Sequence, residues 1–362
     1  MNKHVPVIAL TGGPCGGKTS LMAMVNEKLS NFGYKVFIVP EAATLLMEAG
    51  LNKREASFQK YVLEQIIFEE DLLRDAAMNC DGKSVVIADR GAMDGMAYAG
   101  ADAFSEVIGS LGYKIPDLRD KRYDGVVHLV TAADGAQEFY TLENNRVRDE
   151  SPEEAILRDR EIQKAWLGTP KLKIIGNESS DFKQKKRKAF KAICGILGLP
   201  IPLEIERKFS LKNNFDLRSI PVPYQEIHII QNYLFSENGS EEERIRKRGQ
   251  DKSYVYFHTI KSAIVGLVRS EREKIISKSE YLDFMKHRNP RLGTIEKRRF
   301  CFIWKNQYFE LDSFIHPSFK KPLLEIESTE ENDKVELPDF LPIDREVTGN
   351  HMYSNRYIAE HC

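Results

Sequence analysis

Up to about residue 198, the chain alternates short runs of mainly apolar residues with longer stretches of helical character. The apolar runs are VPVIALT, YKVFIVP, SVVIADR, GVVHLVT and LKIIGN. Strands that read as continuous apolar runs are buried on both faces, and helices between them connect parallel neighbours. The pattern therefore predicts an α/β domain, with a parallel sheet and helices on both faces.

The pattern changes after Pro202, where apolar and charged residues alternate along short segments that are separated by turns. These segments are EIERKFS, IIQNYLF, EERIRKR, YVYFHTIK, SEREKII, TIEKRRF, YFELDSF and LLEIES. Several short alternating strands in succession predict an antiparallel barrel or sandwich. A chain of 362 residues can bury two separate cores. We place the domains at 1–198 and 199–362, with the boundary between residues 196 and 203.

Composition narrows the class of protein further. The 53 basic and 54 acidic residues give a formal charge of −1, so any phosphate binding must come from local patches. The five cysteines are scattered without CxxC pairs, which argues against a zinc site or disulfide framework and suits a reducing compartment. No apolar run approaches the roughly 18 residues of a membrane span, and we find no signal-peptide pattern. We therefore expect a cytoplasmic protein without a transmembrane segment, for which peripheral membrane contact stays open.

A glycine-rich segment follows the first apolar run. Its letters, GGPCGGKT, fit the phosphate-loop pattern G-x-x-x-x-G-K-[ST] between a predicted strand and a predicted helix. Glycines let backbone N–H groups turn toward phosphate oxygens, and the helix start adds positive potential. Lys18 can reach the β- and γ-phosphates, and the Thr19 hydroxyl can bind Mg²⁺. The predicted contacts of ATP or GTP are Gly12, Gly13, Pro14, Cys15, Gly16, Gly17, Lys18, Thr19 and Ser20.

Three acids follow the strands predicted to lie beside this loop. Glu41 comes just after the second strand, Asp89 ends the third, and Asp94 lies one helical turn beyond Arg90. An acid at the carboxyl end of a parallel strand can hold Mg²⁺ or its water, and one near an acceptor can act as a base. Helix caps and surface salt bridges use the same residue types. The later segment NRVR, at 145–148, could offset charge on a transferring phosphate, and a solvated charged helix explains it equally well.

The motifs GGPCGGKTS, VPEAA, IADRGAMD and the arginine segment resemble the kinase-like P-loop family that includes nicotinamide-riboside and deoxynucleoside kinases. The resemblance covers residues 5 to about 195. It implies Glu41 as a base and Arg146 and Arg148 as lid residues that close over the phosphates. The sequence carries no separate signature of a nucleoside acceptor. The residues predicted to act in catalysis are Lys18, Glu41, Asp89, Arg146 and Arg148, and Thr19 and Asp89 are the predicted Mg²⁺ ligands.

In the second half, acids and bases recur on one side of successive predicted strands. Side chains alternate between the faces of a strand, so Glu204, Glu206 and Lys208 share one face. The pattern recurs at Arg244, Arg246 and Arg248, at Glu271 and Glu273, at Lys297 and Arg299, at Glu310 and Asp312, and at Glu325 and Glu327. A solvated outer face could look the same. Acids and bases are segregated by strand, however, which favours carboxylates that coordinate a divalent cation and bases that clamp a polyphosphate.

This arrangement resembles the CYTH family, also called triphosphate tunnel metalloenzymes, from about residue 200 to 355. The ExExK segment at 204–208 is joined by RIRKR, by T-x-K at 259–261, by KRR at 297–299 and by LEIE at 324–327. The resemblance implies an antiparallel eight-stranded tunnel that binds triphosphate with Mg²⁺ or Mn²⁺. Its implied metal ligands are Glu204, Glu206, Glu325 and Glu327. Its implied phosphate contacts are Lys208, Arg244, Arg246, Lys261, Lys297 and Arg299.

The order of the two modules resembles the TRPL translocation defect protein family, which is associated with GTP and with phosphoinositide or phosphatidic-acid binding in membrane traffic. Our leading hypothesis is a phosphohydrolase or phosphotransferase with an ATP or GTP site and a metal-dependent triphosphate tunnel. A GTP-regulated protein that binds phosphorylated lipid headgroups is one alternative. A small-molecule kinase with the tunnel as a regulatory sensor is another. We expect no specific nucleic-acid partner, because no aromatic platform accompanies Arg244 to Arg248.

Overall fold

The computed structural model describes residues 3–139, 151–177, 182–199, 205–212, 217, 220–235, 242–261, 271–317, 319, 321–328 and 334–361. The chain divides into two compact units, Met1–Leu197 and Gly198–Cys362. The sequence places the domain boundary between residues 196 and 203.

The first unit is built on a parallel sheet of five strands in the order β2-β3-β1-β4-β5. The parallel sheet predicted from the apolar runs is thus confirmed. Strands β1, β3 and β4 are almost entirely buried because they lie inside the sheet and are covered on both faces. The strands span Val7–Gly12 (β1), Tyr34–Val39 (β2), Lys83–Asp89 (β3), Gly125–Leu129 (β4) and Leu172–Ile175 (β5).

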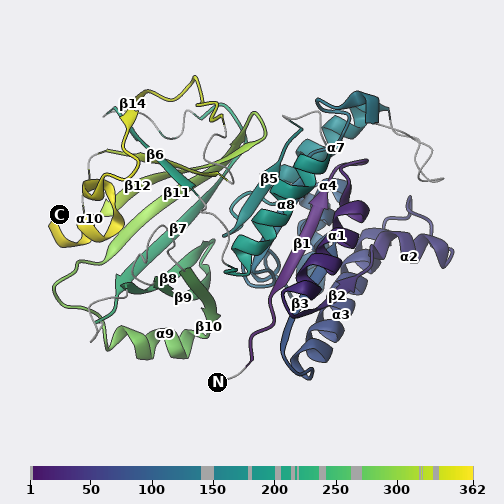
Figure 1. Ribbon diagram of the computed structural model, residues 1–362, viewed down its shortest axis with the longest axis horizontal. Coiled ribbons are helices and arrows are strands. Elements are labelled where there is room, and N and C mark those ends of the chain that lie inside the picture. The colour runs from purple at the N-terminus through teal and green to yellow at the C-terminus, as the bar shows by residue number, and fades with distance from the viewer. Residues whose placement is uncertain are drawn as a thin grey trace. The chain divides into compact units, whose positions relative to one another are not determined.

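Helices cover both faces of this sheet, as Figure 1 shows. Helices α1 and α8 pack against each other on one face, whereas α3, α4 and α7 form a second connected layer. The longest, α3, carries charged residues along its length, and no helix in the described ranges is long and apolar enough to cross a bilayer. The helices span Lys18–Asn31 (α1), Ala42–Glu48 (α2), Phe58–Met78 (α3), Asp94–Ala99 (α4), Ala101–Ser110 (α5), Ile115–Arg119 (α6), Pro152–Ala165 (α7) and Phe182–Ile196 (α8), with a 3-10 turn at Gln137–Phe139 (η1).

The strand order determines where the first unit can bind a ligand. The chain crosses from β1 to β2 in one direction along the sheet and from β3 to β4 in the other, so the order reverses around β1. Parallel sheets bind ligands at the carboxyl ends of strands beside such a reversal. The loop after β1 and the residues that end β2, β3 and β4 therefore meet at this edge.

The second unit is an antiparallel sheet in the order β10-β9-β8-β7-β11-β12-β13-β6-β14. It has nine strands rather than the eight predicted. The additional strand, β14, pairs with β6 at the edge of the sheet, and its four residues IDRE show no alternating apolar pattern. The strands span Ile205–Leu211 (β6), Tyr224–Tyr233 (β7), Glu242–Gln250 (β8), Ser253–Lys261 (β9), Glu271–Ile276 (β10), Ile295–Trp304 (β11), Gln307–His316 (β12), Leu323–Ser328 (β13) and Ile343–Glu346 (β14).

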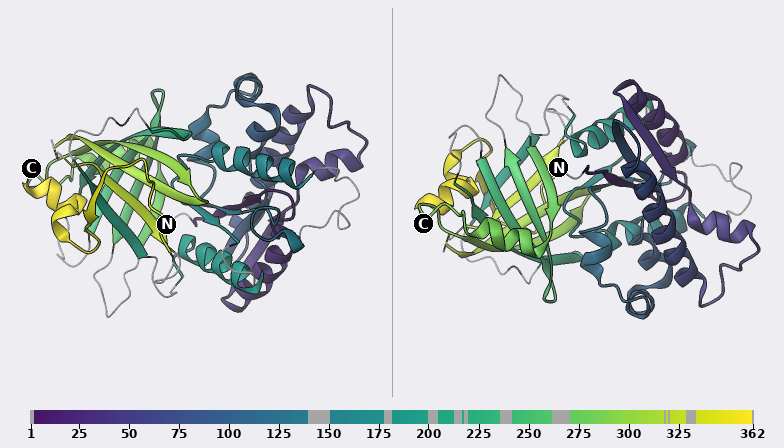
Figure 2. Two further views of the ribbon diagram at one scale, coloured as in Figure 1. Left: turned by 90° about the horizontal axis from the view of Figure 1, so that it is seen from above. Right: turned by 90° about the horizontal axis from the view of Figure 1, so that it is seen from below.

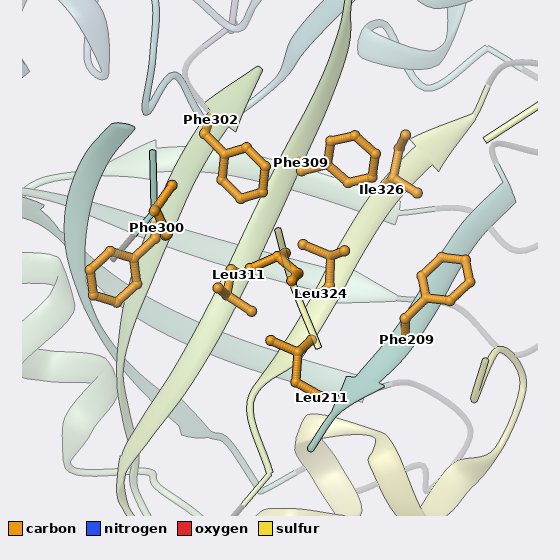
Figure 3. Packing of buried hydrophobic residues seen from close by; sticks show 10 residues of the cluster. Phe209, Leu211, Phe300, Phe302, Phe309, Leu311, Leu324 and Ile326 are labelled. Carbon is orange, nitrogen blue, oxygen red and sulfur yellow. The ribbon is translucent and has the colours of Figure 1, made fainter. Parts of the chain in front are cut away.

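Over strands β6, β11, β12 and β13, one face of this sheet is mainly apolar, and we call it the apolar face. Phe209 of β6 lies opposite Leu324 of β13, and Leu311 of β12 lies opposite Phe300 of β11. Figure 3 shows these side chains converging into one cluster with Phe302, Phe309 and Ile326. Segments beyond the strands cover the cluster through Ile220 and Leu341. Burial of these side chains supplies the main core of the second unit.

Two helices close the second unit on different sides. Helix α9 (Lys278–Met285) packs Tyr281 against Ile245 and Ile276, which lie on the same side of the sheet as the apolar face. Helix α10 (Asn355–His361) follows a 3-10 turn at His351–Tyr353 (η3). It packs Ile358 near Leu323, and Ala359 near Tyr233 and Ile295, at one end of the opposite face. Figure 2 shows α10, in yellow, at the end of the curved strands.

Candidate functional site

The predicted phosphate loop joins the end of β1 to the start of α1, and its packing requires its glycines. A Cβ atom on Gly12 would lie 2.1 Å from the Leu129 carbonyl oxygen, and one on Gly16 would lie 2.7 Å from that same oxygen. Gly17 has a φ of +95°, in the region that favours glycine. Cys15 also has a positive φ, of +56°. The backbone thus follows a path that other residues would clash with or strain.

The start of α1 is prepared for an anion. The helix has no side-chain cap, and its first internal bond runs from the Leu21 N–H to Gly17 O at 3.0 Å. Before the helix, the Gly16 N–H donates to Gly13 O at 3.3 Å, whereas the first N–H groups of a helix have no acceptor within the helix itself. Lys18 is buried, and its ammonium makes no hydrogen bond or salt bridge within the described ranges. Burial, followed by the positive charge of Arg90, lowers the pKa of Lys18. A bound phosphate would accept hydrogen bonds from the helix-start amides and stabilise the charged form of Lys18.

Arg90 organises the acids predicted beside this loop. Its Nε donates to Glu41 Oε1 at 2.5 Å, its Nη1 donates to Gly12 O at 3.2 Å, and Nη1 lies 3.5 Å from Asp94 Oδ2. Burial alone would raise the pKa of Glu41, but the charges of Arg90 and Lys18 outweigh it and lower that pKa to about 2. Glu41 is therefore a firmly charged partner of Arg90. No local sequence signal marks this role of Arg90, because it pairs with an acid that follows a different strand.

Asp89 differs from the other acids. Its Oδ1 is buried without a hydrogen-bonding partner in the part of the chain that the structure describes. Burial raises the pKa of Asp89, with Lys18 and Arg90 opposing that rise. An unsatisfied carboxylate oxygen next to a phosphate loop fits a hard divalent cation such as Mg²⁺. Thr19, the other predicted ligand, lies exposed in the first turn of α1.

Asp94 is held from two other elements. The Thr11 hydroxyl of β1 donates to its carboxylate at 2.7 Å, and Trp166 Nε1, after α7, donates to Oδ1 at 2.5 Å. Asp94 is only 2 % exposed. The structure thus brings Glu41, Asp89 and Asp94 to one edge. The predicted lid residues Arg146 and Arg148 lie outside the described residues.

In the second unit, the strand register collects the predicted charged residues on the face opposite the apolar one. Directly opposite residues on neighbouring strands share a face, and the pairs link Lys208 to Glu325, Glu325 to Glu310, and Arg299 to Asp312. On the other half of the sheet, Arg244 lies opposite Thr259, which lies opposite Glu273. We call this the charged face. Its members are Glu206, Lys208, Arg244, Arg246, Arg248, Lys261, Glu273, Lys297, Arg299, Glu310, Asp312, Glu325 and Glu327; Glu204 lies outside the described residues.

At the centre of the charged face, two bases share one acid. Lys297 and Arg299 both donate to Asp312, which is fully buried at 0 % exposure. Arg299 also pairs with Glu310, and its Nη2 donates to Glu325 Oε2 at 2.8 Å. Burial lowers the pKa of Lys297, whereas the acids around Arg299 outweigh its burial and raise the pKa of the guanidinium. These bases face away from bulk water, which excludes a simple solvated surface.

A second group of charges lies where β6 meets β13. Lys208 Nζ is 2.8 Å from Glu325 Oε1 and 3.3 Å from Glu206 Oε1. The negative charge of Glu325, followed by burial, raises the pKa of Glu206. Glu327 lies opposite Glu206 in the register and is exposed. Carboxylates that repel one another and carry hard oxygen donors fit a divalent cation. Within the described ranges, however, no group of three or more metal-ligating side chains is already gathered into a metal site.

The remaining predicted phosphate contacts lie on β8 and β9. Arg246 pairs with Glu273, whose carboxylate also accepts the Thr259 hydroxyl at 2.8 Å. Arg244 is 8 % exposed. Lys261 is partly buried at the end of β9. These bases belong to the same face as Arg299, so the charged face extends across both halves of the sheet.

The chain is similar to several known proteins. A family model described as an AAA domain matches residues 7–185, within the first unit. The inorganic triphosphatase of Acetivibrio thermocellus is 29% identical over 159 residues, which cover 43% of this chain and 93% of that protein. Among solved structures, the inorganic triphosphatase NE1496 is 27% identical with a TM-score of 0.32, over 45% of this chain and 97% of that chain. A putative adenylyl cyclase from Hippeastrum with a dominant triphosphatase activity is 16% identical with a TM-score of 0.29, over 35% of this chain and 80% of that chain.

Three features expected from the sequence stay predictions. They are the kinase-like character of the first unit, the resemblance to the TRPL translocation defect family and a lipid-headgroup ligand.

Proposed function

We propose that the second unit is a metal-dependent triphosphatase that hydrolyses a phosphoanhydride bond of a small triphosphate-containing substrate. The observation that carries this proposal is the set of buried bases on the charged face, each oriented by an acid. Lys297 and Arg299 are fixed by Asp312, and Lys208 by Glu325. The match to an inorganic triphosphatase over nearly the whole length of that protein supports it.

The bases of this face would bind and orient the phosphate chain. Arg299 presents a planar guanidinium that can form two parallel bonds to phosphate oxygens, and Lys208 and Lys297 add compact charges. Because the acids hold these side chains in place before substrate binds, little side-chain freedom is lost on binding. Buried charges also act through a lower effective dielectric than exposed ones, which strengthens their hold on a transferring phosphate.

The carboxylates at the junction of β6 and β13 would hold a divalent cation. Glu206, Glu325 and Glu327 are the described candidates, and Glu204 is the fourth predicted ligand. Mg²⁺ or Mn²⁺ supplies charge to the phosphoryl oxygens and lowers the pKa of bound water. Glu325 would then exchange part of its pairing with Lys208 and Arg299 for the cation. Those two bases would thereby become available to the substrate.

We further propose that the first unit binds ATP or GTP at the loop from Gly12 to Thr19. The specific observation is a buried Lys18, without a hydrogen bond or salt bridge to the residues that the structure describes, beside an uncapped helix start. Thr19 and Asp89 would hold Mg²⁺, and Arg146 and Arg148 would reach the phosphates. The low pKa of Glu41 makes it a weak proton acceptor. A charged Glu41 paired with Arg90 therefore does not support phosphate transfer to an acceptor that Glu41 would activate.

One experiment separates the two sites. Phosphate release from tripolyphosphate, ATP and GTP is measured with Mg²⁺ and with Mn²⁺ for the wild-type chain, Lys18→Ala and Arg299→Ala. We expect tripolyphosphate hydrolysis to survive Lys18→Ala and to be lost in Arg299→Ala. Binding of MgATP and MgGTP, measured by calorimetric titration of the same variants, should be lost in Lys18→Ala and survive in Arg299→Ala. Tripolyphosphate hydrolysis that depends on Lys18 and not on Arg299 would contradict the assignment of the triphosphatase to the second unit.

A further inference from the structure

Asp159 is a buried acid on α7 that contacts the phosphate loop from outside. Its Oδ1 accepts the Gly13 backbone N–H at 2.6 Å and the Thr131 backbone N–H at 3.1 Å. Gly13 belongs to the loop and Thr131 follows the end of β4. One carboxylate oxygen therefore joins three segments of the first unit that lie far apart in sequence.

The other contacts of this carboxylate keep it charged and fixed. His128 Nε2 lies 3.1 Å from Oδ1, and Gln163 Nε2 donates to Oδ2 at 2.8 Å. Asp159 is 2 % exposed. Burial alone would raise its pKa, but His128 and the hydrogen bonds outweigh burial and lower it. A buried carboxylate with this many donors has a single orientation.

The fit around Gly13 leaves no room for adjustment. A Cβ atom on Gly13 would lie 2.5 Å from Asp159 Oδ1 and 3.0 Å from the Thr131 Cβ. The Thr131 hydroxyl in turn donates to Pro14 O at 2.5 Å. The first residues of the loop are thus held from α7 and from β4 together. This contact also occupies the Gly13 N–H, which leaves the later amides to face a phosphate.

Helix α7 meets the candidate site at a second point. Trp166, the residue at the end of this helix, donates to Asp94 at 2.5 Å. Asp94 lies 3.5 Å from Arg90. Asp159 and Trp166 therefore connect one helix both to the phosphate loop and to the acids beside it.

We propose that Asp159 is a positioning residue for nucleotide binding, which holds the entry of the phosphate loop so that the amides from Gly17 to Thr19 face the phosphates. This inference rests on the proposed nucleotide site. Asp159 does not need to touch the nucleotide, because it acts through the Gly13 amide. Its loss would release the loop entry while Lys18 and the helix start remain.

The variants that test this role separate the contact from general packing. Asp159→Ala removes both acceptors, whereas Asp159→Asn keeps one carbonyl oxygen for Gly13 and Thr131. Gln163→Leu is the matched control, since it removes the donor to Oδ2 and leaves the Gly13 contact in place. Each variant is made in the full chain. Tripolyphosphate hydrolysis by the second unit, which none of them touches, verifies active protein.

Two measurements are made on each variant. Calorimetric titration with MgATP and MgGTP should show an affinity at least about tenfold weaker for Asp159→Ala, the effect of one lost charge-assisted hydrogen bond. Asp159→Asn and Gln163→Leu should stay within about threefold of wild type, although Gln163→Leu lowers the melting temperature. Amide hydrogen exchange without nucleotide should be faster over residues 12–20 in Asp159→Ala than in Gln163→Leu.

The outcomes distinguish this role from the proposed function. Unchanged exchange and unchanged affinity in Asp159→Ala would overturn the positioning role while the nucleotide site stands. An equal loss of affinity in Gln163→Leu would reduce Asp159 to a packing residue. Absence of nucleotide binding by the wild-type chain would instead overturn the nucleotide site and with it the role of Asp159 in nucleotide binding.

Discussion

Arg299 donates from Nε and from Nη2 to the two oxygens of Asp312, at 2.7 Å each. This two-pronged pair lies inside the second unit, where Asp312 is completely buried. Lys297 donates to the same carboxylate. Asp312 therefore compensates Lys297, and it shares the compensation of Arg299 with Glu310 and Glu325.

Asp312→Ala should destabilise the second unit strongly. It would leave Lys297 and Arg299 buried with less compensation, and breaking such a buried pair costs about 3–5 kcal/mol. Trp304 lies in this unit and Trp166 in the other, so urea unfolding followed by fluorescence in a Trp166→Phe background reports the second unit alone.

The matched control for that change is Glu226→Ala. Glu226 lies 3.5 Å from Arg298, and both side chains are about half exposed, at 45% and 54%. An exposed pair contributes about 0–1 kcal/mol. Equal destabilisation by Asp312→Ala and Glu226→Ala would contradict the structural role of the buried pair.

Arg299→Lys should lower kcat/KM for tripolyphosphate by roughly a hundredfold, because a lysine cannot reproduce a planar fork that contacts three acids. Arg298→Lys is the control on the same strand, since Arg298 points to the opposite face and is exposed. Steady-state phosphate release compares the two. Similar rates in both variants would show that the charged face does not bind the substrate.

Glu206→Gln should change how stability responds to pH and metal. The pKa of Glu206 is raised, so the protonated carboxyl stabilises the fold at low pH and this stabilisation is lost as the pH rises through the raised pKa. Without a divalent cation, Glu206→Gln should therefore melt higher than wild type at pH 8, by a small margin because the side chain is 51% exposed. At pH values well below the raised pKa, the two proteins should melt alike.

Adding Mn²⁺ or Mg²⁺ at pH 8 should reverse that order. The cation would stabilise the wild-type chain through Glu206 and its neighbours, and chelation should remove the gain. Glu226→Gln, on the other face, should respond to metal as the wild type does. A melting temperature of Glu206→Gln that rises with metal as much as that of the wild type would remove Glu206 from the metal site.

Gly12→Ala should destabilise the first unit far more than Gly82→Ala. Both glycines have a positive φ, of +144° and +77°, but a Cβ on Gly82 meets nothing within 4 Å while one on Gly12 meets Leu129 O. Gly82→Ala should cost about 1–2 kcal/mol from backbone strain alone. Gly12→Ala adds a clash with a backbone atom. Its loss of unfolding free energy, followed by circular dichroism during thermal unfolding, should be at least twice that of Gly82→Ala. Equal effects would mean that the loop has room to move.

The sequence predicts the parts of this structure that depend on local periodicity. Continuous apolar runs identify β1, β3 and β4 because burial on both faces removes polar positions. Strict alternation predicts the charged face, since Lys297, Arg299 and their neighbours all obey a period of two. The phosphate-loop pattern is equally local in sequence, although the reason for Gly12 and Gly16 is the close approach of the distant Leu129 carbonyl.

Other features have no local pattern. Strand β14 has four mainly polar residues and forms only because β6 offers it an edge. From the sequence alone, Asp159 is one of several charged residues on a helix expected to face solvent. Only its contact with Gly13, 146 residues away, indicates the proposed role. Arg90 and Glu41 pair across β2 and β3 in the same way. Tertiary contact, and not spacing, decides these positions.

The two faces of the strands in the second unit have different roles. Phe209, Leu311 and Leu324 form the core on one face. Lys208, Asp312 and Glu325 lie on the other, where the proposed substrate would bind. A mutant library confined to peripheral bases of the charged face, such as Lys261, would vary the anion that is recognised without changing the apolar core. The same strand can therefore acquire a new specificity one alternate position at a time, without a new fold.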